Sequence, residues 1–591
     1  MSYFLVLSKC HGDSVLSQYQ RLRDDHRMCD IVLETRGVQF PAHRSLLACA
    51  SDYFWALLKE HTRESQQTLA GPLRLPALTP TGLERLLDFI YSSWLRLSPA
   101  TLEETLAAAC YLQVTSAVEL CARYISDNLA LESCCFFANV ASRYGLSGAL
   151  EAANAYIARH MRELLGSGGD RAGLTELNLG SLQEALGAED VPGVRESDLL
   201  RLALDWLDRN ELPALHSNLL LSRVRFGLVG PQELEQLTAG RSALRTPFIR
   251  SLVDKALRYH TQGPLQPLLQ SAHTQIRASG DGHVLLVGGG PEADRPQRLV
   301  QSFDPESRTF RTLATQLPGR LQHHCVCVIG GFLFVLGGEE VEAIGESEKA
   351  AVMTVTERVW RYDPRFQRWA EAEPMIQRRA QFACCVLDGV IYAIGGRVES
   401  GEPALTTAER YNLRAGCWRK SVTLPHAVHG HACAVLDKSI YISGGIHGEA
   451  IESSKDVLHL DMLEGHVWAK RAAMSIARFG HQMATVGERI YSFLGMYEQF
   501  CDIERYDPEL DQWTRLRPLL NDRFCYGLSA TSDGRVLLFG GRKWHDGQEV
   551  VMSNVMEYDT ESDAWRELCR MPSPLCGTQC VHLAILDTPA T

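Results

Sequence analysis

The 591-residue sequence has little of what several large protein classes require. No apolar run approaches the 18 or more residues of a membrane-spanning helix, so we expect no membrane insertion. The eighteen cysteines form no Cys-X-X-Cys pair and no Asn-X-Ser/Thr acceptor occurs, which argues against a zinc or redox motif and against a glycosylated chain. The net charge of -12 disfavours a nucleic-acid partner. We therefore expect a cytoplasmic protein that can also be nuclear.

Short catalytic motifs are also missing. The chain has no GxxxxGK phosphate loop, no HExxH zinc motif and no GxSxG nucleophile turn. Met1 to Cys10 lacks a basic leader and a cleavage region, so it does not predict a secretory signal. The segment His323-His324-Cys325-X-Cys327 is superficially metal-like, but strand alternation sends neighbouring side chains to opposite faces. We predict a non-catalytic protein without a cofactor or metal.

What the second half does contain is a repeat. A short apolar run ends in a glycine pair, and an aromatic-Asp pair follows, with a large aromatic residue seven or eight positions beyond it. The glycine pairs are Gly288-Gly289, Gly337-Gly338, Gly395-Gly396, Gly444-Gly445 and Gly540-Gly541, with Leu494-Gly495 as a degenerate sixth. Their spacing is 46 to 58 residues, and five of the ten tryptophans occupy the last aromatic position. A period near fifty built from short strands is typical of kelch propeller blades.

The strands and the ring closure can be placed as well. Runs such as Val390 to Ile394 and Ser439 to Ser443 are β-branched and aromatic, and turn pairs such as Asp388-Gly389 precede them. The first glycine pair follows only one strand, His283 to Val287, whereas the C-terminus ends with an unmatched one, Thr578 to Leu586. We predict that the C-terminal strand completes the first blade, which leaves no long open edge.

The first half contains different motifs. A short strand at Cys29 to Glu34 precedes Phe40-Pro41-Ala42-His43-Arg44, which leads into a helix and the block Ser51-Asp52-Tyr53-Phe54. Together with Asp30, Arg63-Glu64-Ser65 and Tyr111-Leu112-Gln113, these motifs resemble a BTB domain. The later helical pairs, especially Asp198 to Val229 with Trp206 and the Asn218 to Phe226 run, resemble a BACK domain.

The ordered set resembles the Kelch-like (BTB-BACK-Kelch) family over nearly the whole chain. The resemblance implies an α+β BTB domain at 1–127, an all-α BACK domain at 128–262, a linker at 263–274 and an all-β six-bladed kelch propeller at 275–591. It also implies a homodimeric substrate adaptor of a cullin-3 RING ubiquitin ligase. A cytoskeletal, actin-associated or scaffold role without a ligase is the alternative, and transcriptional repression is a weaker third possibility.

Two sets of contact residues follow from the resemblance. The matching cullin-binding positions are Leu58, Thr62, Glu64, Tyr111, Leu129 and Leu131. Thr62 stands where the family has a hydrophobic residue, and Leu131 where proline is frequent. The dimerisation positions are Val15, Leu16, Tyr19, Leu22, Asp30 and His43. The first four form an apolar stripe on a predicted helix, whereas Asp30 and His43 have the alternative role of holding the fold.

One propeller face is predicted to bind the substrate protein. In a four-stranded meander, the loops after the second and the fourth strand emerge on the same side. We place the substrate-binding residues there: Arg320, Arg378, Arg379, His429, Arg478, Arg523, Tyr497, Arg542 and Trp544. Such an arginine cluster suits an acidic or phosphorylated peptide.

The longest loop on that face is acidic. Twenty-three residues separate Gly338 from Tyr362, against fourteen in the third and fourth blades, and the excess carries Glu339, Glu340, Glu342, Glu346 and Glu348. A partner-selecting arm, a self-occluding lid and a disordered insertion all remain open interpretations.

Overall fold

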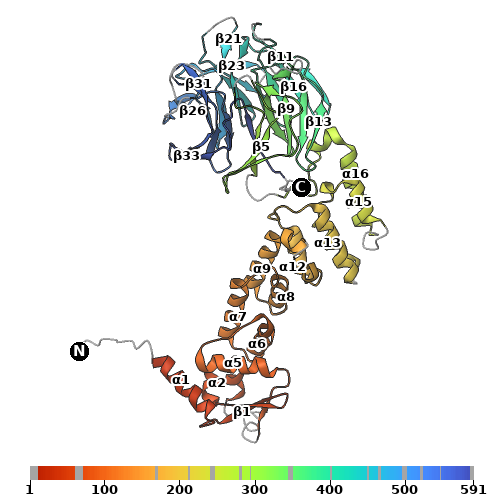
Figure 1. The fold of residues 1–591 in the computed structure, drawn as a ribbon, viewed down its shortest axis with the longest axis vertical. Coiled ribbons are helices and arrows are strands. Elements are labelled where there is room, and N and C mark those ends of the chain that lie inside the picture. Colours follow the sequence, from red (N-terminus) through yellow and green to blue (C-terminus); the bar gives the residue numbers. More distant parts are fainter. Residues whose placement is uncertain are drawn as a thin grey trace, which may run out of the picture. The chain divides into compact units, whose positions relative to one another are not determined.

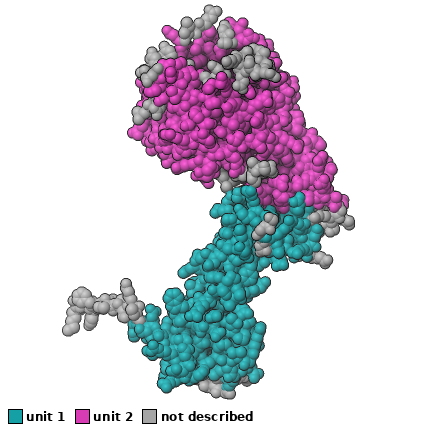
Figure 2. Space-filling model, viewed as in Figure 1, with its two compact units in different colours: residues 1–192, 201–223 teal, residues 193–200, 224–591 magenta. Residues whose placement is uncertain are grey.

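A computed structural model describes residues 11–59, 71–166, 169, 171–210, 213–239, 246–277, 282–292, 295–343, 351–399, 402–448, 452–462, 467–495, 502–519, 523–545 and 547–585. The chain forms two compact units, one of residues 1–192 and 201–223 and one of residues 193–200 and 224–591 (Figure 2). No helix among these residues is long and apolar enough to cross a membrane.

The first unit is mainly helical (Figure 1). Its elements are α1 (His11–Asp24), β1 (Ile31–Thr35), β2 (Val38–Ala42), α2 (Arg44–Ala50), α3 (Asp52–Leu57), β3 (Leu73–Arg74), α5 (Pro80–Ser92), α6 (Pro99–Tyr111), α7 (Thr115–Asp127), α8 (Cys134–Arg143), α9 (Ser147–Arg159), α10 (Met161–Leu165), α11 (Arg171–Thr175), α12 (Leu179–Gly187) and α14 (Ala214–Leu221). Helix α13 (Glu196–Arg209) belongs partly to each unit.

A small sheet and the helices around it form the BTB-like part. Strand β1 pairs antiparallel with β2 and parallel with β3. Alternation along β1 buries Ile31 and Leu33, which join a core that contains Phe54, Leu83 and Leu87. The Ser51 side chain accepts a hydrogen bond from the Phe54 backbone nitrogen, so α3 starts with a capped first turn.

The helices that follow have a separate core. Leu102 and Leu106 from α6 meet Cys121 and Ile125 from α7 and Phe137 from α8. Further along, the indole nitrogen of Trp206 donates to the Leu177 carbonyl at 2.9 Å. The apolar helical spacing seen in the sequence therefore gives a stack of helices, as expected for the BACK-like region.

The last helices of this region cluster with the propeller rather than with the first unit. They are η1 (Phe226–Leu228), α15 (Pro231–Thr238), α16 (Pro247–Thr261) and η3 (Gly263–Leu268). Arg365 anchors them to the propeller, since its guanidinium hydrogen-bonds to the Tyr259 hydroxyl and to the Thr274 carbonyl and lies 3.7 Å from the centre of the Phe332 ring.

Among the described residues, the propeller has six four-stranded antiparallel sheets. In chain order the blades are: blade 1, β34 (Gln579–Leu583), β4 (His283–Val287), β5 (Val300–Asp304), β6 (Thr309–Thr312); blade 2, β8 (Cys325–Ile329), β9 (Phe332–Leu336), β12 (Val359–Asp363), β13 (Arg368–Ala372); blade 3, β14 (Ala383–Leu387), β15 (Val390–Ile394), β16 (Ala408–Asn412), β17 (Cys417–Lys420); blade 4, β19 (Ala432–Leu436), β20 (Ser439–Ser443), β22 (Val457–Asp461), β23 (Trp468–Arg471); blade 5, β24 (Gln482–Val486), β25 (Arg489–Phe493), β26 (Ile503–Asp507), β27 (Gln512–Arg515); blade 6, β28 (Gly527–Ala530), β29 (Arg535–Phe539), β32 (Asn554–Asp559), β33 (Ala564–Arg570).

Short ribbons lie between these strands. They are β7 (Leu321–Gln322), β10 (Glu339–Ala343), β11 (Ala351–Val355), β18 (Val428–His429), β21 (Ile446–His447), β30 (Arg542–His545) and β31 (Gln548–Val551). The predicted closure is confirmed, because the C-terminal β34 pairs with β4 as the inner strand of blade 1. The six inner strands contact one another around the whole ring.

The glycine pairs are needed where neighbouring blades approach each other. Gly337 and Gly338 have φ values of 51° and 97°, and a Cβ on Gly337 would lie 2.6 Å from the Arg379 carbonyl oxygen in the next blade. The degenerate pair Leu494-Gly495 also has positive φ values, with Leu494 at φ 45°. That backbone is strained for leucine, which shows that the ring geometry dictates the turn.

The repeated tryptophans join the outer parts of successive blades. The Trp418 indole nitrogen donates to the Glu373 carbonyl of blade 2 at 2.8 Å, and its ring packs on Tyr411. Trp468, Trp513 and Trp565 donate to the preceding blade in the same way. The large rings at the repeated position therefore connect each blade to the preceding one.

Candidate functional site

Loops from two positions of each blade meet on one face of the propeller. Strand β7, before the inner strand of blade 2, pairs with β10, which follows the glycine pair of that blade. Strands β18 and β21 make the same pairing in blade 4, and Ala380 bridges Arg397 in blade 3. The predicted convergence of both loop sets is therefore correct. We call this surface the loop-bearing face.

Six residues in the left-handed conformation form a ring at the centre of this face. One precedes each inner strand: His323, Gln381, Gly430, Gly480, Cys525 and Gly577, with φ between 51° and 72°. Backbone hydrogen bonds join neighbours, for example Gly430 N to the Gln381 carbonyl at 2.7 Å and Gly480 N to the Gly430 carbonyl at 2.8 Å. We call these residues the mouth ring, since all six line a cavity of about 310 Å³.

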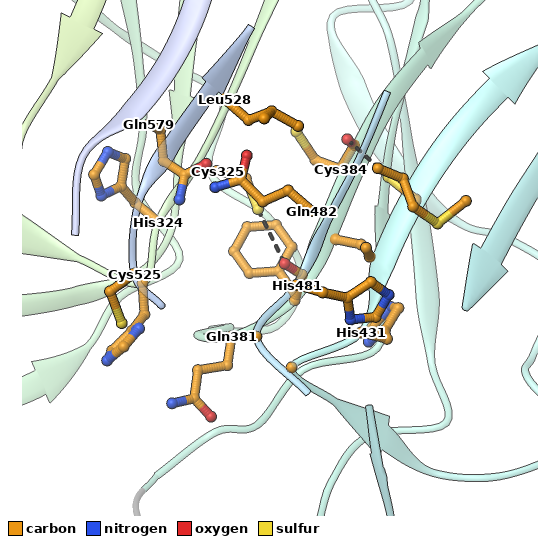
Figure 3. Close-up of a pocket in the computed structure, with 18 of the residues that line it drawn as sticks. His324, Cys325, Gln381, Cys384, His431, His481, Gln482, Cys525, Leu528 and Gln579 are labelled. Atoms are coloured by element: carbon orange, nitrogen blue, oxygen red, sulfur yellow. Dashed lines mark hydrogen bonds between the residues drawn. The ribbon is translucent and has the colours of Figure 1, made fainter. Parts of the chain in front are cut away.

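The cavity wall is formed by the first residues of the inner strands (Figure 3). Amides, thiols and small side chains dominate it, among them Gln482, Gln579, Cys325 and Cys384. No Lys, Arg, Asp or Glu is among the described residues that line the cavity. Burial raises the pKa of the Cys580 thiol, which therefore stays protonated at neutral pH.

Three histidines follow the mouth ring by one residue and lie in the seams between the inner strands. Burial lowers the pKa of His324 to about 4 and that of His431 to about 3. His324 Nε2 donates to the Val287 carbonyl at 3.2 Å, and His481 Nε2 lies 2.8 Å from the Ser443 hydroxyl of the preceding blade. The imidazoles are thus neutral at pH 7, and His324 and His481 connect adjacent blades.

The prediction that Arg379, Arg478 and Arg523 form an exposed substrate-binding rim is wrong. Arg379 has 0% relative exposure, and the other two are also buried. Arg379 pairs with Glu409 at 2.8 Å and donates to the Gly395 and Thr407 carbonyls. The register of the loop points these side chains into the blade, where they hold the glycine turn.

The same position is aliphatic in the other three blades. Two residues before the mouth ring, blades 3, 5 and 6 have these arginines, whereas blades 2, 4 and 1 have the buried residues Leu321, Val428 and Leu575. Glu409 of blade 3 and Glu504 of blade 5 occupy equivalent register positions, where blade 4 has Leu458. This buried site therefore holds an arginine with a glutamate in blades 3 and 5, an arginine with Met556 at the glutamate position in blade 6, and an apolar pair in blade 4.

The remaining predicted face residues lie at the surface, but the structure pairs two of the arginines with acids. Arg378 pairs with Glu399 at 2.6 Å, and Arg542 pairs with Glu549 at 2.8 Å. Arg320 and Trp544 are exposed, and His429 is half-buried against the edge of the Phe479 ring. Tyr497 lies outside the described residues.

The acidic loop begins and ends as an ordered ribbon. Strands β10 and β11 form a hairpin, which excludes a wholly unstructured insertion between Gly338 and Tyr362. Glu339 is buried, accepts a hydrogen bond from Gln322 and pairs with Arg397 at 3.0 Å. Glu346 and Glu348 lie outside the described residues. Part of the acidic charge thus neutralises an arginine of the same face.

The predicted dimerisation residues divide into two groups. On α1, Val15 is 41% exposed and Leu16 and Leu22 are half-buried, whereas Tyr19 packs on the BTB-like core and on the His43 ring. His43 is buried and lies 2.8 Å from the Tyr91 hydroxyl, and Asp30 accepts from the Arg44 backbone nitrogen. In the chain itself, therefore, Tyr19, Asp30 and His43 stabilise the BTB-like fold.

Of the predicted cullin-binding residues, Thr62 and Glu64 lie outside the described residues. Tyr111 is exposed and its ring packs against Tyr53, while Leu58, Leu129 and Leu131 are half-buried. The sequence analysis missed Trp55, which is 57% exposed on α3. Its signal is the helical spacing, since the buried Phe54 places its neighbour Trp55 on a different side of the helix.

No group of three or more His, Cys, Asp or Glu side chains within the described part of the chain is arranged to hold a metal ion. Apart from His323 and His324, which belong to the superficially metal-like segment, the mouth-ring residues and the glutamines and histidines beside them were not singled out from the sequence. Their signal is positional: each lies next to the start of an inner strand, which can be located by counting back from the glycine pairs.

The fold defines a protein class with a BTB-type α/β domain, a helical region and a six-bladed propeller. Comparison with known families agrees. The BTB/POZ domain matches residues 19–129, the "BTB And C-terminal Kelch" domain residues 134–239, and the KLHDC2/KLHL20/DRC7 Kelch-repeats domain residues 255–445 and 381–588.

Full-length relatives show the same order of domains. The chain is 44% identical to Kelch-like protein 34 of Homo sapiens, across 99% of this chain and 97% of that protein. It is 30% identical to Kelch-like protein 36 of Bos taurus and 29% identical to Kelch-like protein 26 of Danio rerio, across 97% and 98% of this chain and 92% and 94% of those proteins. The chain belongs to the Kelch-like family.

Proposed function

We propose that this protein is a non-catalytic, dimeric adaptor that brings a protein substrate to a cullin-3 RING ubiquitin ligase. The observation that carries the proposal is the full BTB-BACK-Kelch order combined with a propeller whose two loop sets converge on one face. The BTB-like part would bind the cullin and a second copy, and the loop-bearing face would bind the substrate.

Exposed apolar side chains on the first unit support a cullin contact. Trp55 on α3, Tyr111 at the end of α6 and Phe136 on α8 are all exposed. Large rings of this kind are common anchors of protein interfaces, since they bury much area with few rotatable bonds. Trp55 is the sharper test residue than Leu58, because Leu58 also packs on the domain core.

The cullin contact can be tested with matched tryptophan variants of the full chain. We expect Trp55→Asp to weaken binding to purified cullin-3 by about 2 kcal/mol or more, measured by calorimetry. Trp94→Asp is the control, because Trp94 is 80% exposed in the same domain but is not among the expected contacts. Wild-type protein that does not bind cullin-3 at all would refute the ligase role and favour the scaffold alternative.

The apolar residues of α1 support the dimer. Val15 is exposed and Leu16 is half-buried, whereas Tyr19 is covered by its own domain. We expect the double variant Val15→Asp, Leu16→Asp to be a monomer of about 65.8 kDa by light scattering, while Tyr19→Asp mainly destabilises the fold. A well-folded double variant that keeps twice the monomer mass would exclude α1 as the interface.

A further inference from the structure

The chemistry of the central cavity narrows the class of partner that the proposed function requires. The sequence predicted an arginine cluster for an acidic ligand. In the structure, Arg379 is buried on Glu409. On the face itself, Arg397 is paired with Glu339 and Arg542 with Glu549, so the charges beside the mouth ring balance.

Below the mouth ring the cavity offers no fixed charge. Its described wall has no Lys, Arg, Asp or Glu, and burial lowers the pKa of His323, His324, His431 and His481. A carboxylate or phosphate placed there would lose its hydration without gaining a cationic partner. Burial of an unpaired charge is strongly unfavourable, so acidic side chains are excluded from the interior.

The cavity does offer neutral hydrogen-bonding groups. The buried Gln381 side-chain oxygen has no hydrogen-bond partner. Gln579 is half-buried, and its side-chain amide forms part of the cavity wall (Figure 3). Phe479 and Leu528 supply apolar surface beside these amides. A primary amide carries donors and an acceptor, so it pairs best with another amide or with a hydroxyl. Pockets that combine apolar walls with a few polar groups are typical binding sites.

The residues of the mouth ring also differ in side-chain size from blade to blade. Its members in blades 4, 5 and 1 are Gly430, Gly480 and Gly577, which have no side chain, whereas blades 2, 3 and 6 place His323, Gln381 and Cys525 at the entrance. Side chains from three blades thus border the entrance, and the Phe479 ring lies against Gly430.

We propose that the cavity receives an uncharged segment of the partner protein, led by a side chain that carries an amide or a hydroxyl, and that it rejects acidic and phosphorylated segments. This inference rests on the proposed function, in which the loop-bearing face binds a protein. It reverses the ligand class that the arginine count suggested.

The probe is a phage-displayed library of short random peptides, panned on the full chain. We expect a consensus whose central positions hold Asn, Gln, Ser or Thr and exclude Asp and Glu. The synthetic consensus peptide should bind by fluorescence polarisation, and an Asp or phosphoserine at its central position should weaken binding about ten- to a hundredfold. An acidic consensus, or no consensus at all, would overturn the proposal.

Two cavity variants locate the binding. Gln579→Glu puts a carboxylate into the wall, and Gln579→Ala removes the amide, so both should weaken the consensus peptide about tenfold or more. Arg419→Ala, at an exposed position of the outer strand β17, is the control and should leave binding unchanged. Thermal melting of each variant confirms folding. Binding that is insensitive to both Gln579 changes would contradict the proposal.

Failure of this inference can be told apart from failure of the adaptor role. Affinity purification of the full chain reports cullin-3 and substrate proteins regardless of peptide chemistry. Recovery of cullin-3 together with an acidic peptide consensus would remove only the cavity inference. A neutral consensus without cullin-3 binding would remove only the ligase role.

Discussion

Two neighbouring residues, Arg378 and Arg379, represent two regions of the propeller that differ sharply. Arg379 lies in the buried seam at the end of the inner strands, with no exposed surface and three protein partners. Arg378 lies on the rim above it, with a side chain that is 45% exposed and one ion pair to Glu399. One position along the chain separates a structural residue from a surface residue.

The comparison shows that residue type alone does not identify a binding residue in a repeat protein. In the seam a buried guanidinium needs polar partners: Arg379 has the Glu409 carboxylate and two carbonyl groups, and Arg523 donates to the Gly540 carbonyl and the Asn554 side-chain oxygen. On the rim, water competes with the ion pair, so the same side chain contributes little to stability. The following predictions test this contrast from the largest effect to the smallest.

Replacing Arg379 by Ala should give the largest effect. The change leaves the Glu409 carboxylate buried without its cation, and we expect the free energy of unfolding to fall by about 3–5 kcal/mol. The double variant Arg379→Val, Glu409→Leu copies the apolar pair of blade 4, Val428 and Leu458, and should lose less than the single change. Urea denaturation of the three proteins measures both values. A double variant that loses as much stability as Arg379→Ala, or more, would contradict this account of the pair.

The buried seam histidines should make stability depend on pH. The folded pKa of His324, about 4, lies below the ordinary value of 6.5, so the folded state resists protonation. The contribution is complete above pH of about 6.5 and is lost as pH falls towards about 4, by up to about 3 kcal/mol. His324→Phe, which copies Phe382 of blade 3, should flatten this part of the stability profile in denaturation experiments. An unchanged slope between about pH 6.5 and 4 would contradict the assignment.

The outer tryptophans should show a smaller effect. Trp418→Phe removes the indole donor to the Glu373 carbonyl, whereas the Trp369 indole nitrogen is buried without a hydrogen-bond partner. We expect Trp418→Phe to be more destabilising than Trp369→Phe by about 1 kcal/mol, the value of one hydrogen bond. Thermal or urea denaturation of the two variants gives the difference. Equal losses of stability would mean that the repeated rings stabilise the propeller by packing alone.

Arg378→Ala should give the smallest effect. Both partners of its ion pair are about half-exposed, so we expect a change of at most about 0.5 kcal/mol in the free energy of unfolding. A loss comparable to that of Arg379→Ala would abolish the distinction between seam and rim. The same denaturation series contains this measurement.

The propeller could be predicted from the sequence in considerable detail. The strands at 283–287, 390–394 and 439–443 and the closing C-terminal strand were all located by glycine pairs and apolar runs. These signals are local, because a glycine pair at positive φ and a β-branched run each follow from short-range sterics. The family and its order of domains followed from the same kind of local motif.

The candidate site was predicted less well. Arg379, Arg478 and Arg523 were assigned to the surface, and the cavity residues Gln381 and Gln579 were not identified. A side chain just before an inner strand can point into the seam, into the cavity or into water, and a shift of one position along the chain changes which of these it faces. The backbone conformation that sets this direction depends on contacts with the next blade, which is about fifty residues away in the chain.

Local motifs in the chain were enough to predict the repeat, the strand positions, the ring closure and the family, because each depends on residues close together or on a regular period. Only the tertiary structure decided which charges are neutralised. Arg397 meets Glu339 from a different blade, and Arg379 meets Glu409 across one blade, so the charge of the loop-bearing face cannot be counted from the sequence. Electrostatic interactions fall off over a few ångströms of space rather than along the chain, and this is why the fold was needed to assign them.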